Sequence, residues 1–199
     1  MLGIWQLSES TEQLLGLLDL NEQEKILYAN LKREKRKIEW LAARVLLKEL
    51  INETHIDYDE WDKPFLKNKS WHISISHSGS YVAVIINLNT AVGIDIQLIT
   101  KKITLVANKF MNETELDTLT TINYAEQLHV FWCAKEALYK LYGKKELSFK
   151  ADILIAPFEY KSSGEIVGTL ITPINKLTIP LRYQKLNNYI LVYTTVLNF

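Results

Sequence analysis

The sequence has a single cysteine, no excess of either charge and no long apolar run, and each of these features argues against a class of protein. Cys133 is the only cysteine in 199 residues, so the chain cannot close a disulfide on itself, and we expect a reducing compartment. Lys plus Arg and Asp plus Glu both number 23, so the net charge gives no support for nucleic-acid binding. No apolar run approaches the ~20 residues that span a bilayer. Residues 1–10 lack the pattern of a signal peptide. We therefore expect a cytoplasmic protein that binds neither nucleic acid nor membrane.

What the chain does contain is typical of a globular protein, with 48% hydrophobic and 23% charged residues. Its length allows one domain or two halves of about 100 residues each. Each half has helical patterns first and antiparallel strand patterns afterwards. The sequence therefore predicts an α+β fold of two similar lobes, each with helices packed on a small antiparallel sheet, related by a pseudo-two-fold. We expect the lobes to be residues 1–98 and 99–199, with any functional site between them.

The periodicity of apolar residues places the individual elements. Long helices are predicted over residues 31–51 and 124–142, with Gly143 as the stop, and shorter helical patterns at 103–110 and 113–119. Strands are predicted, in chain order, at 2–7, 71–77, 81–86, 91–97, 153–158, 166–171, 177–183 and 189–197.

The predicted strand at 91–97 is the most informative stretch. Side chains alternate along a strand, so Asp95 and Gln97 share a face with Gly93. An acid beside an amide, next to bare backbone at Gly93, can hold a hard cation and admit a phosphate. The alternative is an ordinary half-buried strand on which Asp95 is merely solvated.

A second informative stretch lies on the helix predicted at 124–142. Glu136 and Lys140 are four residues apart and therefore neighbours on one helix face, with Lys135 and Trp132 beside them. A surface ion pair worth only ~0.3–0.5 kcal/mol is one interpretation. The bulky aromatic residues around the acid favour a partly enclosed site instead.

Further candidates are basic. Arg36 lies among several cations in the first turns of the helix predicted at 31–51, and Arg44 interrupts a small, apolar run. These charges belong either to a solvated helix face or to an anion site. His77 ends a predicted strand beside a glycine turn, where it can serve as a ligand or as a cap of that turn.

Four motifs in order resemble those of 4′-phosphopantetheinyl transferases. Residues 93–97 resemble the motif (V/I)-G-(V/I)-D-(I/V)-E, with Gln97 in place of the last acid. Residues 132–140 are similar to W-x-x-K-E-A-x-x-K at every fixed position, and 74–78 match S-x-S-H-S. Residues 63–65 resemble the G-K-P stretch, with Asp62 in place of glycine. The resemblance runs from residue 31 to 145 and implies the two-lobed, monomeric form, like the surfactin-synthetase activating enzyme.

The resemblance implies a reaction and the residues that perform it. A holo-[acyl-carrier-protein] synthase moves 4′-phosphopantetheine from coenzyme A to a serine of an acyl or peptidyl carrier protein, releasing 3′,5′-ADP. Asp95, Gln97 and Glu136 are then the expected Mg²⁺ ligands. Glu136 is also expected to accept the serine proton, directly or through water. Lys140, together with Lys135, is expected to offset charge on the phosphates.

The resemblance also implies contacts to coenzyme A. Ser76 and His77 are expected at its phosphates, Lys63 along the nucleotide, and Arg36 and Arg44 at the 3′-phosphate.

Two other functions compete with the transferase. One is a coenzyme A-binding regulatory protein with a degenerate metal site, because the neutral amide of Gln97 is a poorer Mg²⁺ ligand than a carboxylate. The other is an unrelated metal-dependent phosphohydrolase, which would need more clustered Asp and His residues than this chain offers.

Overall fold

The structure, a computed structural model, describes residues 1–67 and 71–195. The first half of the chain contains, in order, β1 (Leu2–Gln6), α1 (Thr11–Leu15), α2 (Glu22–Ala29), α3 (Glu34–Ile51), β2 (Asp57–Tyr58), β3 (Pro64–Phe65), β4 (His72–Ser78) and β5 (Tyr81–Asn87). The second half contains β6 (Ile94–Leu98), η1 (Lys101–Leu105), α4 (Ala107–Phe110), α5 (Glu113–Leu116), α6 (Tyr124–Tyr142), β7 (Ile153–Ile155), β8 (Ser163–Ile171), β9 (Lys176–Leu186) and β10 (Tyr189–Thr194).

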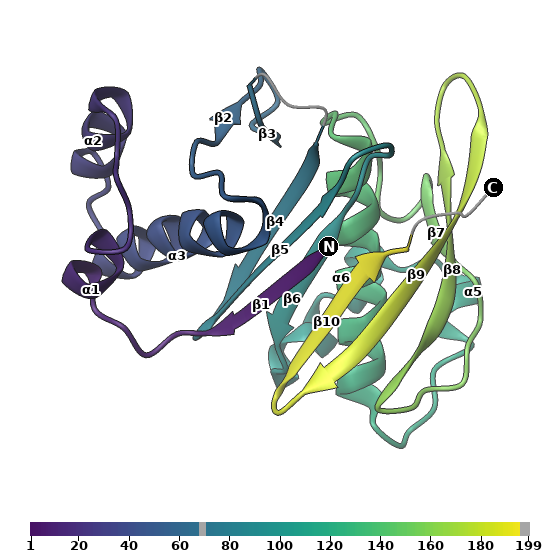
Figure 1. Cartoon of the computed structure of the whole chain (residues 1–199). Coiled ribbons are helices and arrows are strands. Elements are labelled where there is room, and N and C mark those ends of the chain that lie inside the picture. The colour runs from purple at the N-terminus through teal and green to yellow at the C-terminus, as the bar shows by residue number, and fades with distance from the viewer. Residues whose placement is uncertain (68–70, 196–199) are drawn as a thin grey trace.

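Within the described residues the strands form two antiparallel sheets of five strands each. Their orders are β1-β5-β4-β3-β2 and β6-β10-β9-β8-β7. Helix α3 packs against β5 and β1 of the first sheet, and α6 packs against β6, β10 and β7 of the second (Figure 1). The predicted α+β class is thereby confirmed, whereas the pseudo-two-fold stays a prediction. In the part of the chain that the structure describes, no helix is long and apolar enough to cross a membrane.

The two long helices have the expected location, and one begins later than predicted. Helix α6 spans Tyr124–Tyr142 and ends at Gly143, whose φ of 79° suits a glycine. Helix α3 begins at Glu34 instead of residue 31, because the Leu31 amide donates to the Tyr28 carbonyl at the end of α2. Arg33 is still extended there, with a φ of −102° and a ψ of 128°.

The C-terminal strands differ from the prediction in length. The hairpin of β8 and β9 is longer than expected, pairing from Ser163 with Gln184 to Ile171 with Lys176. The residues beyond the predicted bounds, 163–165, 176 and 184–186, are mostly polar, so apolar content alone does not mark them as strand. Strand β7 is shorter and ends at Ile155. The predicted end of the last strand at 197 lies outside the described residues.

Three serines on β4 join the two sheets. The hydroxyls of Ser74, Ser76 and Ser78 accept hydrogen bonds from the backbone N–H groups of residues 94, 96 and 98, at 3.3, 3.1 and 3.0 Å respectively. Strand β6 is an edge strand of the second sheet, so these groups would otherwise be left unpaired. The alternating serines thus place β6, and with it Asp95, against β4.

An apolar cluster packs between the sheets behind this junction. It contains Tyr81, Ala83 and Ile85 from β5, residues Val92, Ile94 and Ile96, and Leu191 from β10. The sequence predicts a lobe boundary after residue 98, whereas β6 already pairs with β10 in the second sheet. The second sheet therefore begins at Ile94, inside the span predicted for the first lobe.

Candidate active site

Asp95 is held on β6 between β4 and α6. It is 1% exposed, so it is not the solvated strand residue of the alternative interpretation. Its Oδ1 accepts hydrogen bonds from Ser76 Oγ and from Lys140 Nζ, both at 2.7 Å. Its Oδ2 accepts from Gln97 Nε2 at 3.2 Å. Burial and the neighbouring Asp95 carboxylate together raise the pKa of the Cys133 thiol well above its usual value.

Glu136 and Lys140 face this carboxylate from α6. Lys140 Nζ pairs with Asp95 and also donates to the Ile94 carbonyl at 3.1 Å. The ammonium thus bonds to groups of β6, whereas the surface ion pair of the alternative interpretation would join Lys140 to Glu136 along the helix. Two of its three N–H groups are used in this way, and its side chain is 29% exposed. Lys140 therefore keeps a donor for an incoming anion.

The pKa of Glu136 is raised to about 7. Burial is the largest cause, and the negative charge of Asp95 adds to it, while Lys140 acts in the opposite direction. Asp95 and Glu136 are therefore close enough to repel each other, and the charge of Lys140 acts on both. A carboxyl with this pKa can gain or lose a proton near neutral pH.

Gly93 brings α6 and β6 close together. A Cβ at this position would lie 1.8 Å from the Ala137 carbonyl oxygen of α6, so any side chain would force the helix away. The expectation that bare backbone here admits a phosphate is wrong, because the helix fills that space. Instead, the close approach brings Glu136 and Lys140 within reach of Asp95.

A cavity of about 220 Å³ opens beside this group. It is lined by residues of both halves of the chain. Cations and aromatic rings both contribute to it: Arg36, Arg44, Lys63, Lys140, Lys144, Lys145, Trp40, Tyr58, Trp61 and Tyr139. Such a lining suits a ligand that combines phosphate groups with a flat ring system.

His77 and Arg36 lie at the cavity together with Glu39. His77 Nδ1 is 3.2 Å from Glu39 Oε1, and Arg36 Nη1 contacts both His77 Nε2 and Glu39 Oε2. Burial lowers the pKa of His77, with Arg36, Lys140 and Lys35 acting in the same direction and Glu39 opposing them. His77 thus bonds to α3 across the site, which distinguishes it from a simple turn cap.

Lys63 connects the two halves at the far end of the cavity. Its Nζ donates to the Leu141 carbonyl at 2.8 Å, near the end of α6, and its stem lies over Gly143. Burial lowers the pKa of Lys63. Asp62 beside it pairs with Lys145 at 2.5 Å.

Ser76 occupies a different place from the one predicted. It is 4% exposed, donates to Asp95 and accepts from the Ile96 amide. Its hydroxyl is therefore occupied within the protein, and we replace the predicted contact to coenzyme A by support of Asp95.

Lys135 also has another role than predicted. Its Nζ donates to Glu115 Oε2 at 2.8 Å and to the carbonyls of Phe149 and Ile153 at 2.7 and 2.6 Å. The residue is 0% exposed, and all three N–H groups of the ammonium are used. We therefore remove Lys135 from the predicted phosphate contacts.

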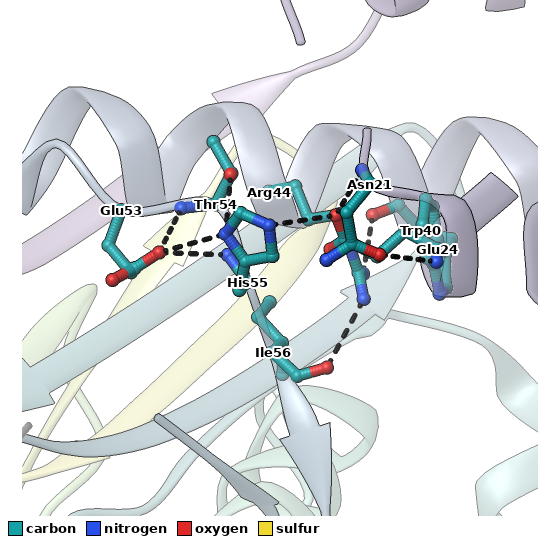
Figure 2. A network of polar contacts seen from close by, with 8 residues as sticks. All are labelled: Asn21, Glu24, Trp40, Arg44, Glu53, Thr54, His55 and Ile56. Atoms are coloured by element: carbon teal, nitrogen blue, oxygen red, sulfur yellow. Dashed lines mark hydrogen bonds and ion pairs between the residues drawn. The ribbon is translucent and has the colours of Figure 1, made fainter. Parts of the chain in front are cut away.

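Arg44 is likewise bound within the protein, as Figure 2 shows. Its Nε donates to Glu24 at 3.0 Å, and its other nitrogens donate to the carbonyls of Trp40 and Ile56. The guanidinium carbon lies 3.3 Å from the centroid of the Trp40 ring. The second oxygen of Glu24 contacts His55 at 3.5 Å. Arg44 is 0% exposed and belongs to the wall of the cavity, and these partners already occupy its guanidinium, so its contact to a 3′-phosphate stays a prediction.

A divalent cation fits the donor set at Asp95. The structure brings two carboxylates together, those of Asp95 and Glu136, and adds the amide of Gln97. Over the described ranges 1–67 and 71–195, no group of three or more His, Cys, Asp or Glu side chains is placed to hold a metal. Mg²⁺ commonly uses one or two carboxylates and completes its shell with phosphate oxygens and waters.

Sequence reasoning missed several residues of the cavity. Tyr58, Trp61 and Tyr139 line it, as do Lys144 and Lys145. The two lysines directly follow the predicted helix stop, so their position at the end of α6 could have been inferred. The aromatic residues come from β2, the turn after it and one face of α6, and their meeting depends on the fold.

Comparison with known proteins adds a family to this geometry. Residues 91–194, just over half of the chain, match the 4′-phosphopantetheinyl transferase superfamily. The chain belongs to this superfamily. The match includes Asp95, Gln97, Glu136 and Lys140, whereas Arg36, Lys63 and His77 precede it. No curated protein matches the chain significantly.

Proposed function

We propose that this superfamily member moves 4′-phosphopantetheine from coenzyme A to a serine of an acyl or peptidyl carrier protein, in a Mg²⁺-dependent reaction. The observation that supports this most is the group formed by Asp95, Glu136 and Lys140 beside a cavity with a basic and aromatic lining. Phosphoryl transfer needs charge neutralisation and positioning above all, and these residues supply both.

The reaction exchanges one P–O bond for another. The serine hydroxyl oxygen attacks the β-phosphorus of coenzyme A, the bond from that phosphorus to the bridging oxygen breaks, and 3′,5′-ADP leaves. Mg²⁺, held by the carboxylates of Asp95 and Glu136, would neutralise charge on the pyrophosphate oxygens. We assign the serine proton to Glu136, directly or through a water, because its carboxylate lies at the site with Asp95 and Lys140.

The other residues bind and orient the coenzyme. The remaining N–H of Lys140 donates to a phosphate oxygen, where it offsets the charge that develops on the leaving group. Arg36, His77 and Lys63 line the same cavity and hold the nucleotide phosphates. Ser76 keeps Asp95 in place from β4.

We further propose the two-lobed subtype, acting as a cytoplasmic monomer with lobes 1–98 and 99–199, in which β6 at the end of the first lobe pairs into the second sheet. This is supported by the two sheets that a single chain provides and by the cavity lining, which comes from α3, β4 and α6 of that chain.

The test is incubation of the protein with coenzyme A, Mg²⁺ and a panel of apo carrier proteins. Mass spectrometry should show one phosphopantetheine added to a single carrier serine, and chromatography an equal amount of 3′,5′-ADP. Glu136→Gln is the matched control, since it is nearly isosteric and should leave the fold intact while abolishing turnover.

A different outcome would favour the alternative function. Tight coenzyme A binding without modification of any carrier would indicate a regulatory protein with a degenerate metal site. Near wild-type turnover by Glu136→Gln would remove Glu136 from the mechanism.

A further inference from the structure

Gln97 lies two residues from Asp95 on the same face of β6, and its amide is held from two sides. Nε2 donates to Asp95 Oδ2 at 3.2 Å, and Oε1 faces the Ser78 hydroxyl of β4 at 3.4 Å. The oxygen of Ser78 also accepts from the backbone N–H of Leu98 at 3.0 Å. Its hydrogen is therefore left to donate to Gln97.

The chemistry of these partners decides which end of the amide faces Asp95. An ionised carboxylate can only accept hydrogen bonds, and Asp95 is paired with the Lys140 ammonium. A rotated amide would place two acceptor oxygens 3.2 Å apart, with no hydrogen between them. The NH₂ group therefore points to Asp95, and the amide oxygen points to Ser78.

We propose that Gln97 is a positioning residue for Asp95 and not a ligand of the divalent cation. This inference rests on the proposed function, because it divides the candidate ligands of the Mg²⁺ proposed there. Its amide oxygen, the only atom with which a glutamine can bind Mg²⁺, is directed at β4. The protein ligands are then the carboxylates of Asp95 and Glu136.

In the cation-free site, the hydrogen bond from Gln97 helps to orient the Asp95 carboxylate. Ser76 and Lys140 hold Oδ1 of Asp95, and Gln97 holds Oδ2, so three side chains fix one orientation of the carboxylate. An acid at position 97 would instead place a third negative charge beside Asp95 and Glu136. The amide thus keeps Asp95 in position before any cation arrives.

The experiment replaces Mg²⁺ by Mn²⁺, which is paramagnetic and binds similar oxygen ligands. Wild type and Gln97→Ala are loaded with Mn²⁺ and coenzyme A without a carrier, and electron spin-echo modulation in D₂O counts the waters on the metal. We expect the same number of waters in both proteins. The dissociation constant for Mn²⁺ should be larger in Gln97→Ala by roughly tenfold, as for other residues that orient a metal ligand.

A second variant tests the amide without any metal. Gln97→Glu replaces a donor by an acceptor next to Asp95, so we expect its Tm without metal to fall below that of Gln97→Ala. Added Mn²⁺ should raise its Tm by more than that of wild type, because the cation relieves the new repulsion.

Several results would overturn the assignment. One extra water on the metal in Gln97→Ala would show that the amide is a ligand. A Tm for cation-free Gln97→Glu equal to that of wild type would show that no donor had faced Asp95. Mn²⁺ binding that Asp95→Ala leaves unchanged would refute this assignment together with the proposed metal site.

Failure of the transferase proposal can be recognised separately. If wild type binds Mn²⁺ through Asp95, gives equal water counts in the two proteins and yet modifies no carrier, the role of Gln97 stands and the transferase proposal falls.

Discussion

Two lysines on α6, five positions apart, have different roles because their ammonium groups meet different partners. Lys135 is surrounded by the Glu115 carboxylate and two carbonyls, whereas Lys140 bonds to Asp95 and to one carbonyl. A buried ammonium with every donor used contributes to the fold, since removing it leaves a carboxylate unpaired. A partly exposed one with a donor to spare can act on a ligand.

The pair gives a matched experiment. Lys135→Ala should lower the free energy of unfolding by about 3–5 kcal/mol, because Glu115 loses its buried partner. Lys140→Ala also takes the ion-pair partner from buried Asp95 and should lower stability too, but unlike Lys135→Ala it should weaken coenzyme A binding and kcat/KM by roughly tenfold to a hundredfold, as expected for a charged hydrogen bond. Urea denaturation measures the stabilities, calorimetric titration the coenzyme A affinities, and steady-state kinetics kcat/KM. Equal losses of coenzyme A affinity in both variants would contradict the division of roles.

His129 predicts a pH dependence of stability. It is 3% exposed, its Nδ1 lies 2.7 Å from the Ala125 carbonyl, and its Nε2 accepts from the Thr100 amide. The ring is therefore neutral in the fold, and burial lowers its pKa. A depressed folded-state pKa contributes stability that is present above the unfolded value of about 6.5 and is lost as the pH falls through the folded value.

The free energy of unfolding of wild type relative to His129→Gln should therefore decrease as the pH is lowered from neutrality to about 5. Taking the difference between the two proteins cancels the titration of the other histidines. Urea denaturation at several pH values measures it, and a difference that stays constant or grows on acidification would show that His129 is not held neutral.

At the scale of elements, the site depends on how closely α6 approaches β6. Glycine at 93 allows the helix backbone to touch the strand, and the Gly93 amide and carbonyl are both bonded to Thr194 of β10. The strand is thereby fixed from one side and the helix from the other. The distance between Asp95 and Lys140 follows from this packing.

Gly93→Ala should therefore separate the two elements. A Cβ 1.8 Å from the Ala137 carbonyl must displace backbone, and we expect a loss of about 1–3 kcal/mol or more in stability, together with most of the activity. Gly16→Ala is the control, because the nearest atom to its Cβ is at 3.4 Å and its φ is −62°. That change should be neutral or slightly stabilising. Equal stability and activity of the two variants would refute the close-packing argument.

At the scale of the whole molecule, the two sheets are joined by serine side chains where backbone pairing would be expected. Hydroxyls of β4 take the place of a neighbouring strand for β6, and an apolar cluster closes the junction behind them. Cations from α3, from Lys63 just before β3 and from the end of α6 can then line one cavity. The proposed site depends on this junction.

Ser74→Ala tests the junction with little change in shape. It leaves the buried Ile94 amide without its hydroxyl partner, so we expect a loss of about 1–3 kcal/mol in the free energy of unfolding. Ser163→Ala, on the exposed start of β8, should change stability by less than about 0.5 kcal/mol. The same small effect from both substitutions would show that the serine bonds do not hold the sheets together.

Local patterns were enough for part of this protein. The bounds of α6 follow from an apolar period of 3.6 and a glycine that can adopt a positive φ, both of which are properties of neighbouring residues. The shared face of Asp95 and Gln97 follows from strand alternation, and their side chains are bonded to each other. The α+β class follows from the order of such elements.

The tertiary structure alone decided which cations remain available to a ligand. Arg44 and Lys135 resemble phosphate ligands in the sequence, yet Glu24 and Glu115, each 20 residues away, occupy them. Strand β6 likewise joined the second sheet because β10, about a hundred residues later, supplies its partner. These hydrogen bonds join residues that are distant in the sequence and close only in the fold. A periodic pattern predicts which face of an element a residue occupies, but not which distant group lies against that face.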